Sequence, residues 1–171
     1  MASLCRSVCR HSHMARVIMP YGWYPKMTQA DYVLDVLGGE AVFHGPRRSD
    51  PTALRTRIKS GLPYRSLESV CRRLQLTLPE TAMILHTPMR TLARRKRERK
   101  LQAVESDRLV RLARVAAHAV AVFGDEARTA TWLRRPNRAL GGEMPFRLLD
   151  TEVGTAQVED VLGRIEYGIV A

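Results

Sequence analysis

The pattern of hydrophobic positions along this chain predicts a series of short helices. Apolar residues recur every three or four positions at residues 31–43, 52–60 and 66–74, so each stretch carries one apolar face. The pair Gly38-Gly39 ends the apolar period of the first stretch, and Gly61 closes the second, at the position where a helix C-terminus favours glycine. The folded part of the chain is therefore expected to begin with three helices.

Two more short helices follow, with a tight turn between them. Thr77 and Glu80 have the spacing of a capping box, which opens a helix that ends near Leu85. The segment His86-Thr87-Pro88 is the turn, and a second helix covers residues 89–97. Two short helices joined by a turn of three or four residues predict a helix-turn-helix.

The longest apolar period predicts a helix over residues 106–123. Its flank is rich in alanine (Ala113, Ala116 and Ala117), which allows another helix to approach closely. A buried dimer contact and a tightly packed core both account for this flank.

The last part of the chain contains three further helix signals. Asp125 can cap a helix that runs to Trp132, and Pro136 prevents that helix from continuing. Pro145 suits the first turn of a new helix, and Thr151 is the expected N-cap of the final one. The apolar face of the final helix consists of Val158, Val161, Leu162 and Ile165. Together these signals predict an all-α protein.

The chain is strongly basic, and its basic residues are mostly arginine. Lysine and arginine number 28 against 17 acidic residues, which gives a formal net charge of +11. A balance of this kind favours a polyanionic partner, with nucleic acid first and an acidic protein second. The forked guanidinium group suits contacts to phosphate or carboxylate.

Basic residues are densest at residues 90–100, on the second helix of the predicted helix-turn-helix. Most charged helix faces are simply solvated, but this one lies where such motifs meet the DNA groove. We expect Arg90, Thr91 and Arg94, near the start of the helix, to reach bases. The residues expected to neutralise phosphates are Arg95, Lys96, Arg97 and Arg99.

The sequence contains no recognisable active site. Glycine-rich phosphate loops are absent, and no nucleophile is arranged with His44, His86 or His118. An enzyme is therefore the least supported class, and no cofactor is expected. The spacing of Cys5, Cys9, His11 and His13 is not a usual zinc pattern, so no metal is expected and residues 1–28 are interpreted as a disordered tail.

Two further features indicate where the protein works. No apolar run reaches the roughly 20 residues of a membrane span. The chain has three cysteines, an odd number, which argues against a disulfide framework and for a reducing compartment. A cytoplasmic protein without a membrane partner is the expectation.

The region from Trp132 onward carries a long ordered pattern. It reads W-L-x-x-P-N-x-A-L-G-G-x-x-P at 132–145, L-L-D-T-x-x-G at 148–154 and V-x-x-x-L-x-R-I-x-x-G at 158–168. This pattern resembles the C-terminal toxin-binding domain of the Xre/MbcA/ParS antitoxins, partners of RES-domain toxins. The run Arg90-Thr91-Leu92 is similar to the N-terminal module of the same family, and the stretch 109–124 is similar to its connecting helix.

The resemblance implies a type II antitoxin that represses its own operon by binding operator DNA. Residues 29–105 would form an Xre-like helix-turn-helix module, and residues 106–171 would bind an NAD-degrading RES toxin. A homodimer within a larger toxin-antitoxin complex is also implied. The end of the last helix and the tail would block the toxin's active site. The residues expected to bind the toxin are Trp132, Pro136, Asn137, Leu140, Gly141, Arg164, Glu166, Tyr167, Gly168, Ile169, Val170 and Ala171.

Two alternatives stay open at this point. A helix-turn-helix transcriptional regulator without a toxin partner explains the basic excess equally well, but not the pattern from Trp132 to Gly168. An antitoxin that does not bind DNA is the other alternative. His86 occupies the place of a turn glycine, and Pro88 brings no side-chain cap to the second helix, so both depart from the family's usual turn.

Overall fold

The computed structural model of the chain describes residues 29–43 and 50–168. Over these residues the chain is helical and contains no strand, so the predicted all-α class is confirmed. The first half forms α1 (Gln29–Val36), the 3-10 helix η1 (Gly39–Ala41), α2 (Pro51–Ser60), α3 (Tyr64–Leu74), α4 (Leu78–Ile84) and α5 (Met89–Glu98). The second half forms α6 (Ala103–Phe123), α7 (Glu126–Leu133), the 3-10 helix η2 (Arg138–Leu140), α8 (Pro145–Leu148) and α9 (Glu152–Glu166).

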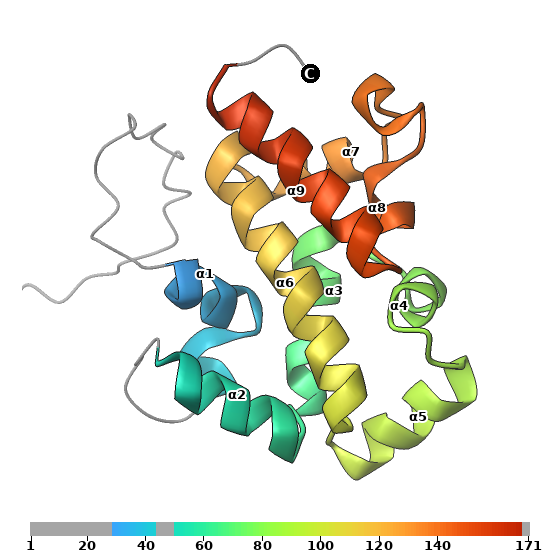
Figure 1. The fold of residues 1–171 in the computed structure, drawn as a ribbon. Coiled ribbons are helices and arrows are strands. Elements are labelled where there is room, and N and C mark those ends of the chain that lie inside the picture. The colour runs from blue at the N-terminus through green and yellow to red at the C-terminus, as the bar shows by residue number, and fades with distance from the viewer. Residues whose placement is uncertain (1–28, 44–49, 169–171) are drawn as a thin grey trace, which may run out of the picture.

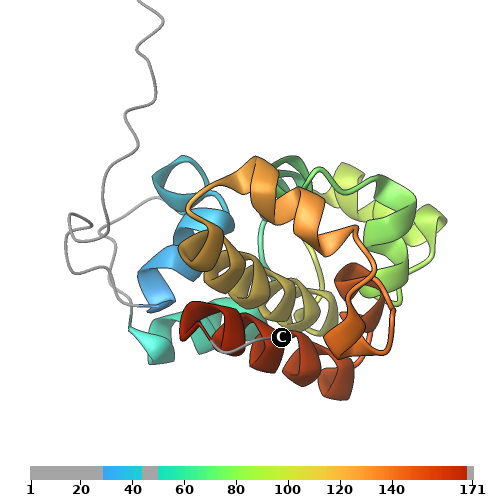
Figure 2. The same ribbon diagram turned by 90° about the horizontal axis from the view of Figure 1, so that it is seen from above.

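Helix α6 runs through the centre of the molecule (Figures 1 and 2). Helices α1, α2, α3, α7 and α9 all pack against it. The alanine flank predicted for this helix is buried by these neighbours, with Ala113, Ala116 and Ala117 at most 2% exposed. Packing inside a single chain therefore accounts for the flank, and no dimer contact is needed to cover it.

Helix α6 begins three residues earlier than the hydrophobic pattern predicts. The backbone N–H of Gln102 donates to a Glu105 carboxylate oxygen at 2.8 Å, which satisfies a donor at the helix start. Ser106 lies inside the first turn, where its hydroxyl accepts from the Leu62 N–H at 2.8 Å and donates to the Gln102 carbonyl oxygen at 2.7 Å. Its role is to join α6 to the loop before α3.

The predicted helix caps are present. Thr77 and Glu80 form a capping box at α4, as the T-x-x-E spacing indicates. The Asp125 side chain accepts from the Arg128 N–H at 2.9 Å, and Thr151 accepts from the Gly154 N–H at 3.1 Å. These side chains satisfy backbone donors that the helix itself leaves unpaired, so local sequence determines where these three helices begin.

Helix α9 lies along α6 and runs in the same direction. Its apolar face is buried as predicted, with Val158, Val161 and Leu162 at most 2% exposed. Three acids of α9 pair with basic residues of α6. The pairs are Arg111–Glu152 at 2.8 Å, Arg114–Glu159 at 3.4 Å and His118–Glu166 at 3.3 Å. Because these pairs are partly exposed, each adds little stability and mainly fixes the register of the two helices.

The structure explains one glycine of the final region and predicts the effect of replacing it. A Cβ atom on Gly154 would lie 2.1 Å from the Leu148 carbonyl oxygen, whereas one on Gly163 of the same helix would have nothing within 4 Å. We expect Gly154→Ala to lower the free energy of unfolding by about 1–3 kcal/mol, because α8 and α9 must move apart. Gly163→Ala, the matched control, should raise it by up to about 1 kcal/mol through helix propensity. Urea unfolding of the two variants measures both, and equal stabilities would contradict the close approach.

Candidate functional sites

The predicted helix-turn-helix is formed by α4 and α5. The turn after α4 has paired backbone bonds, from the His86 N–H to the Met83 carbonyl oxygen at 3.0 Å and from the Thr87 N–H to the Ala82 carbonyl oxygen at 2.9 Å. His86 has φ +47°, the left-handed conformation that glycine usually supplies here. The turn therefore forms with histidine in the glycine position.

The His86 side chain makes a contact that glycine could not make. Its Nε2 lies 2.8 Å from the Asp150 carbonyl oxygen, at the entrance to α9. Since a carbonyl oxygen only accepts, this hydrogen bond requires the proton on Nε2. The histidine thus joins the turn of the helix-turn-helix to the C-terminal helices.

The outward face of α5 is basic. Arg90, Arg94 and Arg97 are spaced i, i+4 and i+7, so they share one face, and all three are exposed. Arg94 is 3.7 Å from Glu98 and Lys96 is 3.8 Å from Glu68, which are long, exposed pairs that leave both cations accessible. Thr91 is half-buried beside Arg90. The structure thus brings most of the predicted DNA-contacting residues to one accessible region.

Arg95 is the exception, and its predicted role does not fit the structure. It is 5% exposed, because it lies three positions after the inward residue Leu92. Its Nε donates to both Glu105 carboxylate oxygens, at 2.9 and 3.0 Å, and its Nη1 donates to Glu98 at 2.7 Å. A guanidinium held in this way joins α5 to α6 and is not available to a phosphate. Its position in the Leu92 stripe was the sequence signal for burial.

The predicted toxin-binding residues of the C-terminal region fall into two groups. In the first, Asn137, Leu140 and Gly141 shape the turn after α7. The Asn137 side chain accepts from the Ala139 N–H at 2.9 Å, Leu140 is 9% exposed, and Gly141 has φ +66°. Pro136 is exposed before this turn. These residues hold the shape of the surface more than they present side chains to a partner.

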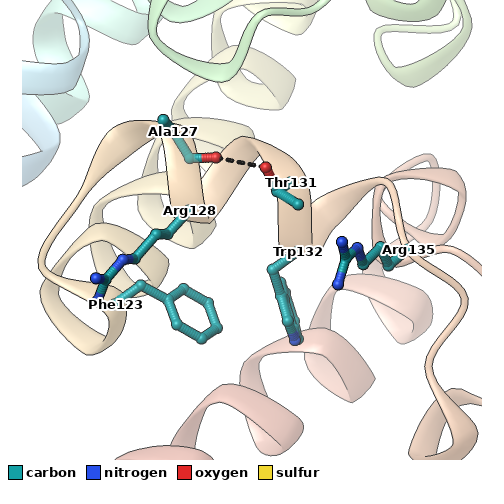
Figure 3. Close-up of a pocket in the computed structure, with 6 residues that line it drawn as sticks. All are labelled: Phe123, Ala127, Arg128, Thr131, Trp132 and Arg135. Carbon is teal, nitrogen blue, oxygen red and sulfur yellow. Dashed lines mark hydrogen bonds between the residues drawn. The ribbon is translucent and has the colours of Figure 1, made fainter.

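Trp132 belongs to the same group and is half-buried against the core. Its ring centroid lies 5.4 Å from that of Phe123, with the two planes tilted by 44°. Figure 3 shows the two rings facing an open cleft, with Arg128 and Arg135 at its sides. Trp132 therefore contributes both to the core and to an accessible surface.

The second group lies on the last turn of α9. Arg164 donates to Asp160 at 2.6 Å and remains exposed, while Glu166 is within 3.3 Å of His118. Tyr167 is 80% exposed, and Gly168 ends the helix with φ +67°. Ile169, Val170 and Ala171, together with Cys5, Cys9, His11 and His13, lie outside the described residues.

One link between the two halves was not visible in the sequence. Arg134, at the end of α7, donates through Nη1 to Glu80 at 2.6 Å and also bonds the Gln75 carbonyl oxygen. Glu80 in turn accepts from the Thr77 N–H at 2.7 Å. The pKa of Glu80 is lowered from its usual 4.5 to about 2, mainly by the hydrogen bond from Arg134. The start of α4 is therefore held by a residue from the C-terminal region.

Neither a metal site nor a membrane-spanning helix is found among the described residues. Within residues 29–43 and 50–168, no three His, Cys, Asp or Glu side chains gather in a way that could hold a metal ion. The same residues include no helix long and apolar enough to cross a membrane.

The fold and these surfaces define a helix-turn-helix protein that carries an additional C-terminal helical domain. Comparison with known families agrees, because the antitoxin Xre-like helix-turn-helix domain matches residues 53–114. The antitoxin Xre/MbcA/ParS C-terminal toxin-binding domain matches residues 118–168. An antitoxin Xre of Pseudomonas putida is 33% identical over 159 residues, 92% of this chain and 93% of the relative. An antitoxin Xre of Photorhabdus laumondii is 36% identical over 128 residues, 74% of this chain and 86% of the relative. The chain belongs to the Xre antitoxin family.

The Glu80–Arg134 pair predicts how stability depends on pH. A carboxyl group whose pKa is lower in the folded state stabilises the fold above its unfolded pKa of 4.5, and this contribution is lost as pH falls toward 2. We expect Arg134→Gln to reduce the fall in unfolding free energy across this window. Arg138→Gln, a change at an exposed arginine nearby, is the control. The measurement is urea unfolding from pH 6 to pH 2, and parallel pH curves for wild type and Arg134→Gln would contradict the assignment.

Proposed function

We propose that this chain is a type II antitoxin that binds a RES-domain, NAD-degrading toxin, blocks its active site and represses its own operon by binding operator DNA. We also propose that it acts in the cytoplasm, without enzymatic activity of its own. The observation that carries the proposal is the coexistence in one chain of an exposed basic recognition helix and a toxin-binding domain of the Xre family.

DNA binding is supported by the geometry of α5. Arg90 and Arg94 lie near the start of this helix, the part that reads base edges in helix-turn-helix proteins, and Arg97 follows on the same face. An arginine can bond two acceptors of a guanine at once, whereas contacts to phosphate carry no sequence information. We therefore assign base contacts to Arg90 and Arg94, and phosphate contacts to Lys96 and Arg97.

The structure of the turn also bears on the alternative of an antitoxin without DNA binding. His86 adopts the left-handed conformation, and Pro88 precedes α5 without disturbing its first hydrogen bonds, from the Thr91 and Leu92 N–H groups to the Pro88 carbonyl oxygen. The two departures from the usual turn residues are thus accommodated. This favours a working DNA-binding unit.

Toxin inhibition is supported by the exposed end of α9. Tyr167 is a large, 80% exposed aromatic side chain, and Arg164 presents a guanidinium close to it in sequence. Aromatic and arginine side chains are the usual anchors of protein interfaces. We propose that this end of the chain, with Ile169, Val170 and Ala171, enters the toxin's active-site cleft. The homodimer implied by the resemblance stays a prediction.

The DNA-binding part of the proposal is tested with single substitutions on α5. Arg97→Ala should weaken binding to all sequences about equally and lower the slope of log K against log salt by roughly one unit. Arg90→Ala should instead reduce the preference for the operator over random DNA. Arg138→Ala, on η2, is the control. Fluorescence anisotropy over a series of salt concentrations measures both effects, and an unchanged slope for Arg97→Ala would remove it from the interface.

The inhibitory part is tested by truncation after Glu166, which leaves all of α9 and the contact between Glu166 and His118 in place. We expect the shortened chain to keep its melting temperature and operator binding but to protect poorly against the toxin. The measurement is cellular NAD and growth when a RES-domain toxin that the full-length chain neutralises is co-expressed with either form. Full protection by the shortened form, present in equal amount, would show that the block lies elsewhere.

A further inference from the structure

The outer face of α7 forms a groove that the fold leaves open. Its inward residues Thr129, Ala130 and Leu133 are at most 2% exposed, so the other side of the helix faces outward. That outer side presents Ala127 and Thr131, two small residues one turn apart. Small residues at this spacing let another chain approach the helix backbone closely.

An aromatic wall and two arginines complete this groove (Figure 3). The cleft has a volume of about 360 Å³ and is lined by Phe123, Ala127, Arg128, Thr131, Trp132 and Arg135, which together we call the α7 groove. Phe123 and Trp132 pack against each other at 5.4 Å and form an apolar surface along one side. Both rings are half-buried against the core, so part of each ring remains accessible.

The two arginines of the groove lack ion-pair partners within the chain. Neither Arg128 nor Arg135 has a carboxylate within 4.0 Å among the residues that the structure describes, and both are exposed. Other charged residues of this region are paired: Glu126 with Arg73 at 3.0 Å, and Arg134 with Glu80. The groove therefore carries two available positive charges at its two ends.

The spacing of these charges indicates the shape of a partner. Arg128 lies on α7 and Arg135 lies two residues beyond its end. They are seven residues apart in sequence, which corresponds to about 10 Å along a helix. Two carboxylates seven residues apart on another helix have the same separation, and an apolar side chain midway between them lies on the same face. Such a helix could place its apolar residue on Phe123 and Trp132 while its acids meet the two guanidinium groups.

We infer that the α7 groove docks an acidic amphipathic helix of the partner toxin, with carboxylates two turns apart bound by Arg128 and Arg135. The identity of the partner as the toxin rests on the proposed function. Charge complementarity with a chain of net charge +11 supports an acidic occupant. The contact is separate from the end of α9, so it supplies affinity for the toxin while the end of α9 supplies inhibition.

Charge reversal tests the inference. We expect Arg128→Glu/Arg135→Glu to weaken binding to a purified RES-domain toxin by at least about 10-fold, mainly through slower association at low salt. The matched control is Arg55→Glu/Arg65→Glu, which makes the same change in net charge at two exposed arginines of α2 and α3. Ala127→Tyr, which fills the groove without changing its charge, should also weaken binding. Melting temperatures verify that each variant folds.

A second probe makes the inference independent of the toxin. A synthetic alanine-rich helical peptide of about 15 residues, with two glutamates seven residues apart and a leucine midway, should bind the wild-type chain. Trp132 fluorescence in a Trp23→Phe background reports this binding. The same peptide with glutamine in place of glutamate, and the charge-reversed variant with either peptide, should show none.

The outcomes separate the inference from the proposed function. If the toxin binds wild type and the charge-reversed variant equally, the inference is overturned and the proposed function stands. If the toxin does not bind wild type but the acidic peptide does, the proposed function fails and the groove remains an acidic-helix site. If neither binds, both are overturned. Charge reversal that instead changes the sedimentation of the chain alone would identify a second copy as the occupant and overturn the assignment to the toxin.

Discussion

The burial of α6 on several sides is the constraint on which the rest of the structure depends. Leu109, Leu112 and Val115 are at most 2% exposed, and helices from both halves of the chain cover them. One helix therefore provides the core for the helix-turn-helix domain and for the C-terminal domain, and neither half has a complete core without it. The Arg95–Glu105 pair fixes α5 to the start of this helix, and breaking such a buried pair on one side typically costs 3–5 kcal/mol. The recognition helix and the toxin-binding domain are thus positioned by the same element.

Two smaller contacts connect the halves at the edge of this core. Arg134 reaches from α7 to the capping box of α4, and His86 reaches from the turn of the helix-turn-helix to the Asp150 carbonyl oxygen before α9. Both ends of α4, a helix of seven residues, are consequently held by the C-terminal region. A helix this short is not stable by itself in water, so its orientation relative to α5 depends on these contacts. A left-handed His86 is consistent with this, since the hydrogen bond offsets part of the cost of its backbone conformation.

The sequence was sufficient for most of the fold because local signals determined it. The caps Thr77, Asp125 and Thr151, the apolar face of α9 and the turn at His86 were all predicted from residue type and spacing and are confirmed. What sequence reasoning missed depends on side chains that meet across the fold. Glu159 pairs with Arg114 of α6, and Arg134 reaches Glu80 at the start of α4. Long arginine side chains can reach several neighbours, so their partners follow from tertiary packing and not from local pattern.

Some arginines of this chain are held by carboxylates inside the fold and others are exposed to a partner, and this difference decides how the high net charge is interpreted. Arg95 and Arg134 are satisfied by carboxylates and hold helices together, so they contribute little to the field that a partner meets. Unpaired charge alone is also not enough to define a site, because Arg55 and Arg65 are exposed on α2 and α3 with no apolar surface assigned to them. On α5 the exposed arginines share one helix face, and at the α7 groove two unpaired arginines flank an accessible aromatic pair. Each surface thus combines charge with a second feature. On α5 this feature is the regular spacing of the arginines along one helix face, and at the α7 groove it is an apolar aromatic pair. In the proposed function, the two combinations suit different partners, so DNA and toxin would contact different arginines.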